Sequence, residues 1–281
     1  MYPAVVAWLH SGPLPWLSYL VPRPGLLYAA VVLVCGALYV HRAVQSGFTT
    51  EVALEVILAA TLAALVGTRL FYLVTRTRFW EMSLPELVNA SKGTASWGAY
   101  LGAALGMSAY ALWRRLPPLQ FVDIGTSVAG LGDAIGRVNC WLTGDDFGKV
   151  TTWAWGIRYP QGSLPWGSHL HRGLVQRTDQ WSLPVHPNTL VLGAAALVVF
   201  LLTSWYWRGH RDRAGRTTAL FCVLYGAERF VVEFLRDPDG GGASGALSHS
   251  QYMCLALICA GAALWWALAH RTPGHRRAPA T

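Results

Sequence analysis

The chain has 281 residues, of which 53% are hydrophobic and 13% charged, and its mean hydropathy is +0.35. An ordinary soluble domain carries about 25% charged residues, so this composition indicates a membrane protein and excludes a soluble enzyme or a disordered chain. Five cysteines are too few for a secreted disulfide scaffold, and the net charge of +8 lies mostly on arginines in short stretches, which suits lipid headgroups better than nucleic acid.

Seven apolar runs are long enough to cross a hydrocarbon core of about 30 Å. They cover residues 25–41, 52–74, 95–113, 119–141, 187–207, 216–235 and 250–270. We therefore predict an all-α, polytopic membrane helix bundle of about seven transmembrane helices, folded as a single transmembrane domain over 1–281. Basic residues in the short loops favour an N-terminus outside and a C-terminus inside.

Two segments are predicted to lie outside the spans. Residues 1–24 contain five prolines and no basic segment before the apolar start, which indicates an interfacial N-terminal arm and not a cleaved signal peptide. The region 142–186 is too polar to span and rich in tryptophan. Because tryptophan prefers the membrane–water interface, we expect an outer-face loop there.

The sixth apolar run carries a polar stripe. Tyr225, Arg229 and Glu233 are four residues apart, so a helix places them on one face. An ionised group at bilayer depth costs a few kcal/mol, which favours either a function or a partner. The functional interpretation is a phosphate-binding arginine, and the alternative is an Arg–Glu pair that only fixes helix packing.

The fourth run repeats this spacing in Asp133 and Arg137 and ends in a glycine-rich segment. Gly136 and Gly148 allow a backbone to approach a ligand closely. Arginines at this depth are suited to hold a phosphodiester because a guanidinium offers a planar fork of donors. The alternative is internal pairing of Asp133 with Arg137. Arg69 is open to two interpretations, a further phosphate contact or a side chain that extends to the interface.

The histidines give a weaker signal. His186 stands before Pro187 at the start of the fifth run, where it is suited either to act as a base or to cap the helix. No spacing among the nine histidines indicates a metal site, and the neighbours Asp145 and Asp146 are only a weak alternative. We expect no metal and no cofactor.

Taken in chain order, these motifs resemble the prolipoprotein diacylglyceryl transferase family. The specific parts are the segment from Gly136 to Gly148 and the pair Arg229 and Glu233. Weaker matches follow the same order: Tyr28, Arg69-Leu-Phe-Tyr72, Ser96 to Gly102, Asp123, His186-Pro187, and Leu247-Ser248 with Gln251.

The resemblance implies a multi-pass enzyme of the bacterial cytoplasmic (inner) membrane. Such an enzyme transfers diacylglyceryl from phosphatidylglycerol to the lipobox cysteine thiol of preprolipoproteins and releases glycerol phosphate. The implied partners are phosphatidylglycerol, the preprolipoprotein signal peptide and the lipid bilayer.

The resemblance also implies residue roles. The catalytic set is Arg229, Glu233, Tyr225 and Asp145. The substrate-binding set is Arg137, Tyr28, Gly136, Asn139, Cys140, Gly148, Arg69, Trp97 and His186. The thiol's proton acceptor stays open between Asp145, Glu233, His186 and a positive field that lowers the thiol pKa.

The chain departs from the family pattern at residues that would be expected to accept or donate a proton. Trp97 stands where the family has histidine, Cys140 replaces asparagine, Asp145 replaces glutamate, and no Leu-Tyr-Glu ending follows Pro187. Two alternatives therefore stay open: a related phospholipid-dependent transferase with a different acceptor, and a non-catalytic lipid-binding paralogue. A transporter is disfavoured because the charges cluster towards one side.

Overall fold

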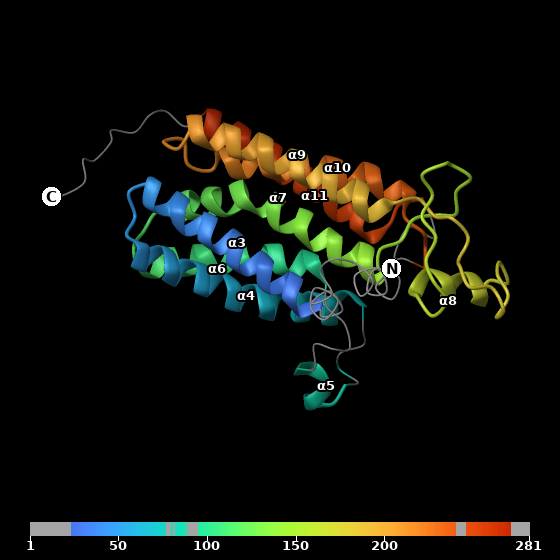
Figure 1. Ribbon diagram of the computed structural model, residues 1–281. Coiled ribbons are helices and arrows are strands. Elements are labelled where there is room, and N and C mark those ends of the chain that lie inside the picture. Colours follow the sequence, from blue (N-terminus) through green and yellow to red (C-terminus); the bar gives the residue numbers. More distant parts are fainter. Residues whose placement is uncertain (1–23, 77–79, 81, 89–94, 240–245, 271–281) are drawn as a thin grey trace, which may run out of the picture. The chain divides into compact units, whose positions relative to one another are not determined.

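The computed structural model describes residues 24–76, 80, 82–88, 95–239 and 246–270. Within these ranges the chain is helical, with four isolated β-bridges and no longer strand, which confirms the all-α prediction. The helices are α3 (Pro24–Gln45), α4 (Thr50–Arg76), α5 (Leu84–Val88), α6 (Ser96–Trp113), α7 (Pro118–Thr143), α8 (Leu164–His171), α9 (Asn188–Gly209), α10 (Arg216–Val232), the 3₁₀ helix η3 (Glu233–Leu235) and α11 (His249–Ala269) (Figure 1).

Helices occupy all seven predicted apolar runs, and four are long and apolar enough to cross a membrane. These four are Leu27–Gln45, Thr50–Thr75, Asn188–Gly209 and His249–Ala269. Charged residues interrupt α7 and α10, and α10 has only 17 residues. The count of seven spans stays a prediction. The arm predicted over 1–24 lies, apart from Pro24, outside the described residues.

The chain divides into two compact units. Unit 1 comprises Met1–Cys35, Val128–Tyr206 and Ala219–Thr281, and unit 2 comprises Gly36–Ser127 and Trp207–Thr218. Each unit is therefore built from segments distant in sequence, and α3, α7, α9 and α10 each contribute residues to both.

Unit 2 is held together by small residues between α4 and α6, which lie side by side (Figure 1). Gly98, Gly102 and Gly106 recur every four residues along α6. A Cβ atom at Gly98 would collide with the Gly67 carbonyl, and one at Gly102 with the carbonyl of Ala63. Glycine at these positions lets the two backbones touch, which is the usual source of helix association in a membrane.

A buried aspartate joins α7 to the start of α10 in unit 2. The Asp123 carboxylate accepts hydrogen bonds from the backbone N–H groups of Gly215 (2.6 Å) and Thr218 (2.7 Å) and from the Thr218 hydroxyl. Gly215 directly precedes α10. Asp123 therefore caps this helix from a different segment of the chain, which satisfies donors that a helix start leaves open.

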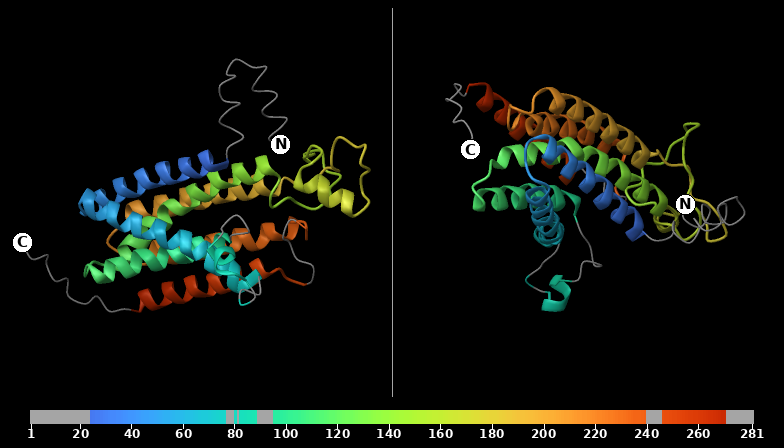
Figure 2. Two further views of the ribbon diagram at one scale, coloured as in Figure 1. Left: turned by 90° about the horizontal axis from the view of Figure 1, so that it is seen from below. Right: turned by 60° about the vertical axis from the view of Figure 1, so that its left-hand side comes forward.

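Close packing at glycines also orders unit 1. Gly130 of α7 lies against Ala196 and Phe200 of α9, and Gly226 of α10 against Cys254 and Ile258 of α11. Leu142 and Thr143 of the predicted 142–186 region still belong to α7, and the rest of that region forms α8 and a loop (Figure 2). A small apolar core of Phe147, Tyr159 and Val185 gives this loop a fixed structure.

Large apolar side chains cover the outside of the long helices. Leu33 is 72% exposed, Leu65 64% and Trp266 66%. A water-soluble protein rarely exposes so much contiguous apolar surface, whereas lipid chains solvate it well.

We expect the replacement Gly102→Leu to destabilise unit 2. The added side chain would meet the backbone of α4, and overpacking of this kind costs about 1–3 kcal/mol. The measurement is the thermal unfolding midpoint in detergent. Gly209→Ala is the control, because a Cβ atom at Gly209 meets nothing within 4 Å. Equal midpoints for both variants would contradict the close packing.

Candidate functional site

Arg137, near the C-terminal end of α7, lies between two carboxylates of unit 1. Its Nη2 is 3.3 Å from Oδ1 of Asp133, one helical turn earlier, and its Nη1 donates to Oδ2 of Asp146 at 2.7 Å. The Arg137 side chain is 7% exposed. The predicted internal pairing of Asp133 with Arg137 is therefore present, and a second carboxylate adds to it.

Asp146 extends the chain of contacts from Arg137 to Arg236. Its Oδ1 accepts a hydrogen bond from the Arg236 guanidinium. Its backbone has φ +54°, in the left-handed region, and Asn188 Nδ2 donates to its carbonyl at 3.0 Å. A conformation that is unfavourable for aspartate is thus held by surrounding contacts, and it directs the carboxylate between two guanidiniums.

Glu233 joins the second and third arginines. Its Oε2 is 3.1 Å from Nη2 of Arg229, and its Oε1 is 3.4 Å from Nη1 of Arg236. The Ser248 hydroxyl donates to the same Oε1 at 3.0 Å. Ser248 also caps α11 in a capping box with Gln251, so the helix start and the glutamate share one serine. The predicted shared face of Arg229 and Glu233 is confirmed.

We call the six side chains of Asp133, Arg137, Asp146, Arg236, Glu233 and Arg229 the arginine–carboxylate network. Three guanidiniums alternate with three carboxylates, which offsets the cost of burying each charge. Burial opposes the ionisation of Asp146, but Arg236 and Arg137 outweigh it and hold the pKa of Asp146 below its usual range. Asp146 is therefore an anion at neutral pH.

Two donors of this network have no acceptor among the described residues. They are Nε of Arg137 and Nη1 of Arg229, and both are buried. A buried donor without an acceptor costs about 1–3 kcal/mol, so such groups call for a ligand or a water molecule. Guanidinium N–H groups in this condition match the oxygens of a phosphate ester.

The loop from 142 to 186 is tied to the segment after α10, and this brings Asp146 to Arg236. Lys149 N donates to Leu235 O at 2.8 Å, Asp237 N to Phe147 O at 3.1 Å, and Arg172 pairs with Asp237. Gly148 is required by this arrangement, since a Cβ atom there would lie 2.5 Å from the His186 carbonyl oxygen. At Gly136, in contrast, a Cβ atom would meet open space.

The comparisons with known proteins decide the family. The sequence pattern of the family described as prolipoprotein diacylglyceryl transferase matches residues 19–267. The chain belongs to this family. The phosphatidylglycerol–prolipoprotein diacylglyceryl transferase of Nitratidesulfovibrio vulgaris strain DP4 is 31% identical over 264 residues and is covered over 90% of its length.

Two further relatives in the prolipoprotein diacylglyceryl transferase family span almost the whole chain. The enzyme of Bordetella parapertussis is 30% identical over 269 residues, which are 92% of each chain. The Clostridium perfringens protein with the same name and the number 2 is 25% identical over 246 residues, 86% of this chain and 88% of that protein. The resemblance stated from the residue motifs is confirmed.

The other residues that the family resemblance implies differ in their contacts. Asn139 of α7 is buried and donates from Nδ2 to the Tyr28 hydroxyl at 3.4 Å. Tyr225 is buried and stacks on Phe221, with 5.3 Å between ring centroids. Cys140 is a free, partly buried thiol. His186 contacts Trp153 edge to face, 5.2 Å between centroids, so its ring belongs to the loop.

Arg69 and Trp97 belong to unit 2, whereas the arginine–carboxylate network belongs to unit 1. Arg69 is 8% exposed and donates from Nε to Leu87 O at 2.9 Å and from Nη2 to Glu86 O, both carbonyls of α5. Its guanidinium also lies 5.5 Å from the Tyr72 ring. It is thus held by backbone carbonyls. Trp97 is the second residue of α6 and is partly buried.

The structure adds four residues that the sequence did not assign to the site: Asp146, Arg236, Ser248 and Asn188. Asp145 is exposed and lies outside the network; its Oδ1 accepts the N–H of Asp146. Arg236 follows Glu233 by three residues, a helical spacing that was available as a signal. Asp146 lies in a turn, where no periodicity distinguishes it from Asp145.

We expect Asp146→Asn to cost about 3 kcal/mol of stability, because it removes the shared partner of two buried guanidiniums. The lowered pKa means that this contribution is present above the usual aspartate pKa of about 3.9 and is lost as the pH falls through the lower folded value. The measurement is the unfolding midpoint against pH. The wild type should lose stability in acid, and the variant should lack that loss.

Asp145→Asn is the matched control for this prediction. It changes the same charge at the neighbouring position and keeps the Oδ1 acceptor, so its effect should stay within about 0.5 kcal/mol. A larger effect for Asp145→Asn than for Asp146→Asn would contradict the assignment of the network.

Proposed function

We propose that this protein transfers a diacylglyceryl group from phosphatidylglycerol to the lipobox cysteine thiol of a preprolipoprotein and releases glycerol phosphate. The observation that carries the proposal is the pair of buried guanidinium donors without an acceptor, Arg137 Nε and Arg229 Nη1, in a member of this family. The relatives carry phosphatidylglycerol and prolipoprotein in their names.

The first step is recognition of the donor lipid. We assign its phosphate to Arg137 and Arg229, whose free N–H groups match phosphate oxygens. The carboxylates of the network position these arginines: Asp133 and Asp146 hold Arg137, and Glu233 holds Arg229. The proposed site is completed by residues of the substrate-binding and catalytic sets: Tyr225, Tyr28, Asn139, Cys140, Gly136 and Gly148. Further candidates for substrate contact are Arg69, Trp97 and His186.

The chemical step exchanges one bond for another. The cysteine sulfur attacks the glyceryl carbon, a carbon–sulfur bond forms, and the bond from that carbon to the phosphate oxygen breaks. The leaving phosphate takes the electron pair, and guanidinium donors stabilise the charge that grows on it. The thiol gives up its proton before or during the attack.

We propose that the Asp145 carboxylate accepts the proton of the lipobox cysteine thiol. Although the Asp145 side chain keeps contact with solvent, partial desolvation and the neighbouring Asp146 carboxylate raise its pKa, whereas the pKa of Asp146 is lowered. Where two adjacent carboxyl groups have pKa values shifted in opposite directions, the group with the raised pKa is the better proton acceptor and the other stays ionised. The alternatives are Glu233, His186 and a positive field that lowers the thiol pKa; the contact of His186 with Trp153 supports a role in the loop instead.

We also propose the membrane arrangement. Seven helices cross the bilayer as a single transmembrane domain, with the N-terminus outside, the C-terminus inside, the arm 1–24 at the interface and the loop 142–186 on the outer face. The four long apolar helices and their exposed leucines support this arrangement. Single-cysteine labelling from each side of intact vesicles, in a background without the five native cysteines, tests it. An inner-face label at Trp153→Cys would contradict it.

The overall proposal is tested with purified protein, labelled phosphatidylglycerol and a lipobox peptide in vesicles. Lipidated peptide and glycerol phosphate in equal amounts are the expected result. Glycerol phosphate formed only with another acceptor would favour the related transferase, for which the replacement of histidine by Trp97 is the supporting observation. Lipid binding without turnover would favour a non-catalytic paralogue.

Arg137→Gln is expected to lower turnover by about 10²–10³-fold, the usual loss when one donor to a developing anion is removed. Arg137→Lys should recover only part of it, because a point charge lacks the bidentate fork. The measurement is the initial rate at equal amounts of folded protein. Arg158→Gln, an exposed loop arginine, is the control and should keep the wild-type rate. Full activity of Arg137→Gln would refute the phosphate contact.

Trp97→His separates the two acceptor hypotheses. If the acceptor is the lipobox thiol, an imidazole at this position should preserve or raise the rate with the peptide. If the acceptor differs, the indole shapes its pocket, and the variant should lose the native reaction without gaining lipobox activity. Initial rates with both acceptors are compared, and unfolding midpoints show whether Trp97 only packs between helices.

A further inference from the structure

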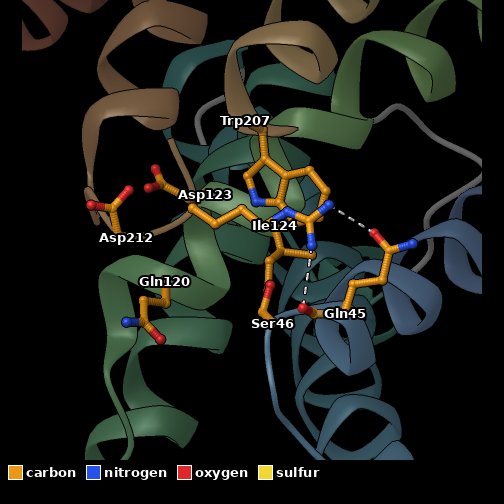
Figure 3. A pocket seen from close by; sticks show the side chains of 8 residues that line it. Gln45, Ser46, Gln120, Asp123, Ile124, Trp207 and Asp212 are labelled. Atoms are coloured by element: carbon orange, nitrogen blue, oxygen red, sulfur yellow. Dashed lines mark hydrogen bonds between the residues drawn. The ribbon is translucent and has the colours of Figure 1, made fainter. Parts of the chain in front are cut away.

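A polar pocket of about 300 Å³ lies in unit 2, where α3 ends, α7 begins and α9 ends (Figure 3). Its wall includes Gln45, Gln120, Trp207 and Arg211, and the acids Asp123 and Asp212. None of these residues belongs to the arginine–carboxylate network, and none is used by the proposed reaction. The pocket is large enough for a small polar group and too small for acyl chains.

Arg211 is held at the pocket by neutral contacts. Its Nη1 and Nη2 donate to Gln45 O at 3.3 Å and Gln45 Oε1 at 3.2 Å, both drawn in Figure 3. Its guanidinium lies 4.5 Å from the ring centroid of Trp207, which is buried. No carboxylate of the described part of the chain forms an ion pair with Arg211. A guanidinium fixed in place without a carboxylate is suited to receive an anion.

Two further arginines lie near Arg211, although they are not part of the pocket wall. Arg42 is buried, donates to the Ser127 carbonyl and hydroxyl at 2.8 and 2.6 Å, and lies 5.1 Å from the same Trp207 ring. Arg208 and Arg211 both repel the Arg42 charge electrostatically. Three like charges this close favour a bound anion, because the anion reduces their mutual repulsion.

The two acids of the wall differ in their surroundings. Both oxygens of Asp123 accept hydrogen bonds from the start of α10, at Gly215 and Thr218, so this carboxylate compensates a helix N-terminus. Asp212 is exposed to solvent. Donor groups among the lining side chains are the Arg211 guanidinium, the Gln120 amide and the Trp207 indole N–H. The amide nitrogen of Gln45 lies 2.8 Å from Nε2 of His41 instead.

Two candidate membrane spans end at this pocket. Leu27–Gln45 ends at a residue of its wall, and Asn188–Gly209 ends two residues after Trp207. A span ends where the hydrocarbon core gives way to headgroups, so the pocket lies at headgroup depth. We propose that it binds the phosphate of an anionic phospholipid, at a site separate from the catalytic one. With the N-terminus outside, this lipid belongs to the inner leaflet.

The test uses phosphatidic acid, whose headgroup is a bare phosphate. The protein is placed in phosphatidylcholine nanodiscs, phosphatidic acid is titrated in, and bound lipid is counted by native mass spectrometry. We expect one tight site in the wild type and about tenfold weaker binding in Arg211→Gln, equivalent to about 1.4 kcal/mol. Gln120→Glu keeps the side-chain size and adds a negative charge to the pocket, so it should weaken binding at least as much.

Arg213→Gln is the matched control, because Arg213 is exposed on the same loop and does not line the pocket. It should change the affinity less than twofold. Equal losses in Arg211→Gln and Arg213→Gln would mean diffuse surface charge and would overturn the site. Unchanged binding in both Arg211→Gln and Gln120→Glu would overturn it as well.

Two further measurements distinguish a phospholipid from free phosphate as the ligand, and the pocket from the proposed catalytic site. Inorganic phosphate at millimolar concentration should not displace the lipid, and displacement would show that free phosphate is the ligand instead. Arg137→Gln should retain the tight binding of phosphatidic acid, because Arg137 belongs to the proposed catalytic site. Loss of binding in that variant would show that the catalytic site had been measured, which would overturn the separate site without touching the proposed reaction.

Discussion

The chain of alternating guanidinium and carboxylate groups is the interaction on which unit 1 depends. Arginine and glutamate at bilayer depth are costly alone, and removal of one member of a buried pair leaves its partner uncompensated. Here Asp146 and Glu233 each contact two arginines, so helix α7, the loop after it and the segment after α10 are joined by a single network. The arginines that we propose for phosphate binding are therefore oriented by the same contacts that make their burial tolerable.

Several local features serve this network. The left-handed backbone of Asp146, the close approach of Gly148 to His186 and the capping box at Ser248 each fix a segment that carries one of its members. Without these contacts, Asp146 would be as free to move as a residue in an ordinary surface turn. Catalysis by oriented donors requires positions fixed to a fraction of an ångström, and in the proposed reaction the small apolar core of the loop would supply this rigidity.

Unit 2 is stabilised in a different way. Its helices α4 and α6 meet through glycine and alanine, so dispersion contacts between backbones act beside an ion pair of Arg114, at the end of α6, with Glu55 of α4. Asp123 lies in the part of α7 that belongs to unit 2, and its buried carboxylate accepts hydrogen bonds from the start of α10. The proposed lipid pocket lies beside that cap, so a bound phosphate would act on the same helix junction that holds this end of unit 2 together.

The positions of the helices and the candidate arginines could be predicted from the sequence, because apolar runs and four-residue spacings are local properties of a helix. The pairing of Arg229 with Glu233 and of Arg137 with Asp133 followed from that periodicity. The family could be inferred for the same reason, since the motifs keep their order along the chain. Only the tertiary structure decided that Asp146, and not Asp145, joins two arginines, and that Asp123 caps α10. Those contacts cross from one segment to another through turns and loops, where no repeat in the sequence indicates which way a side chain points.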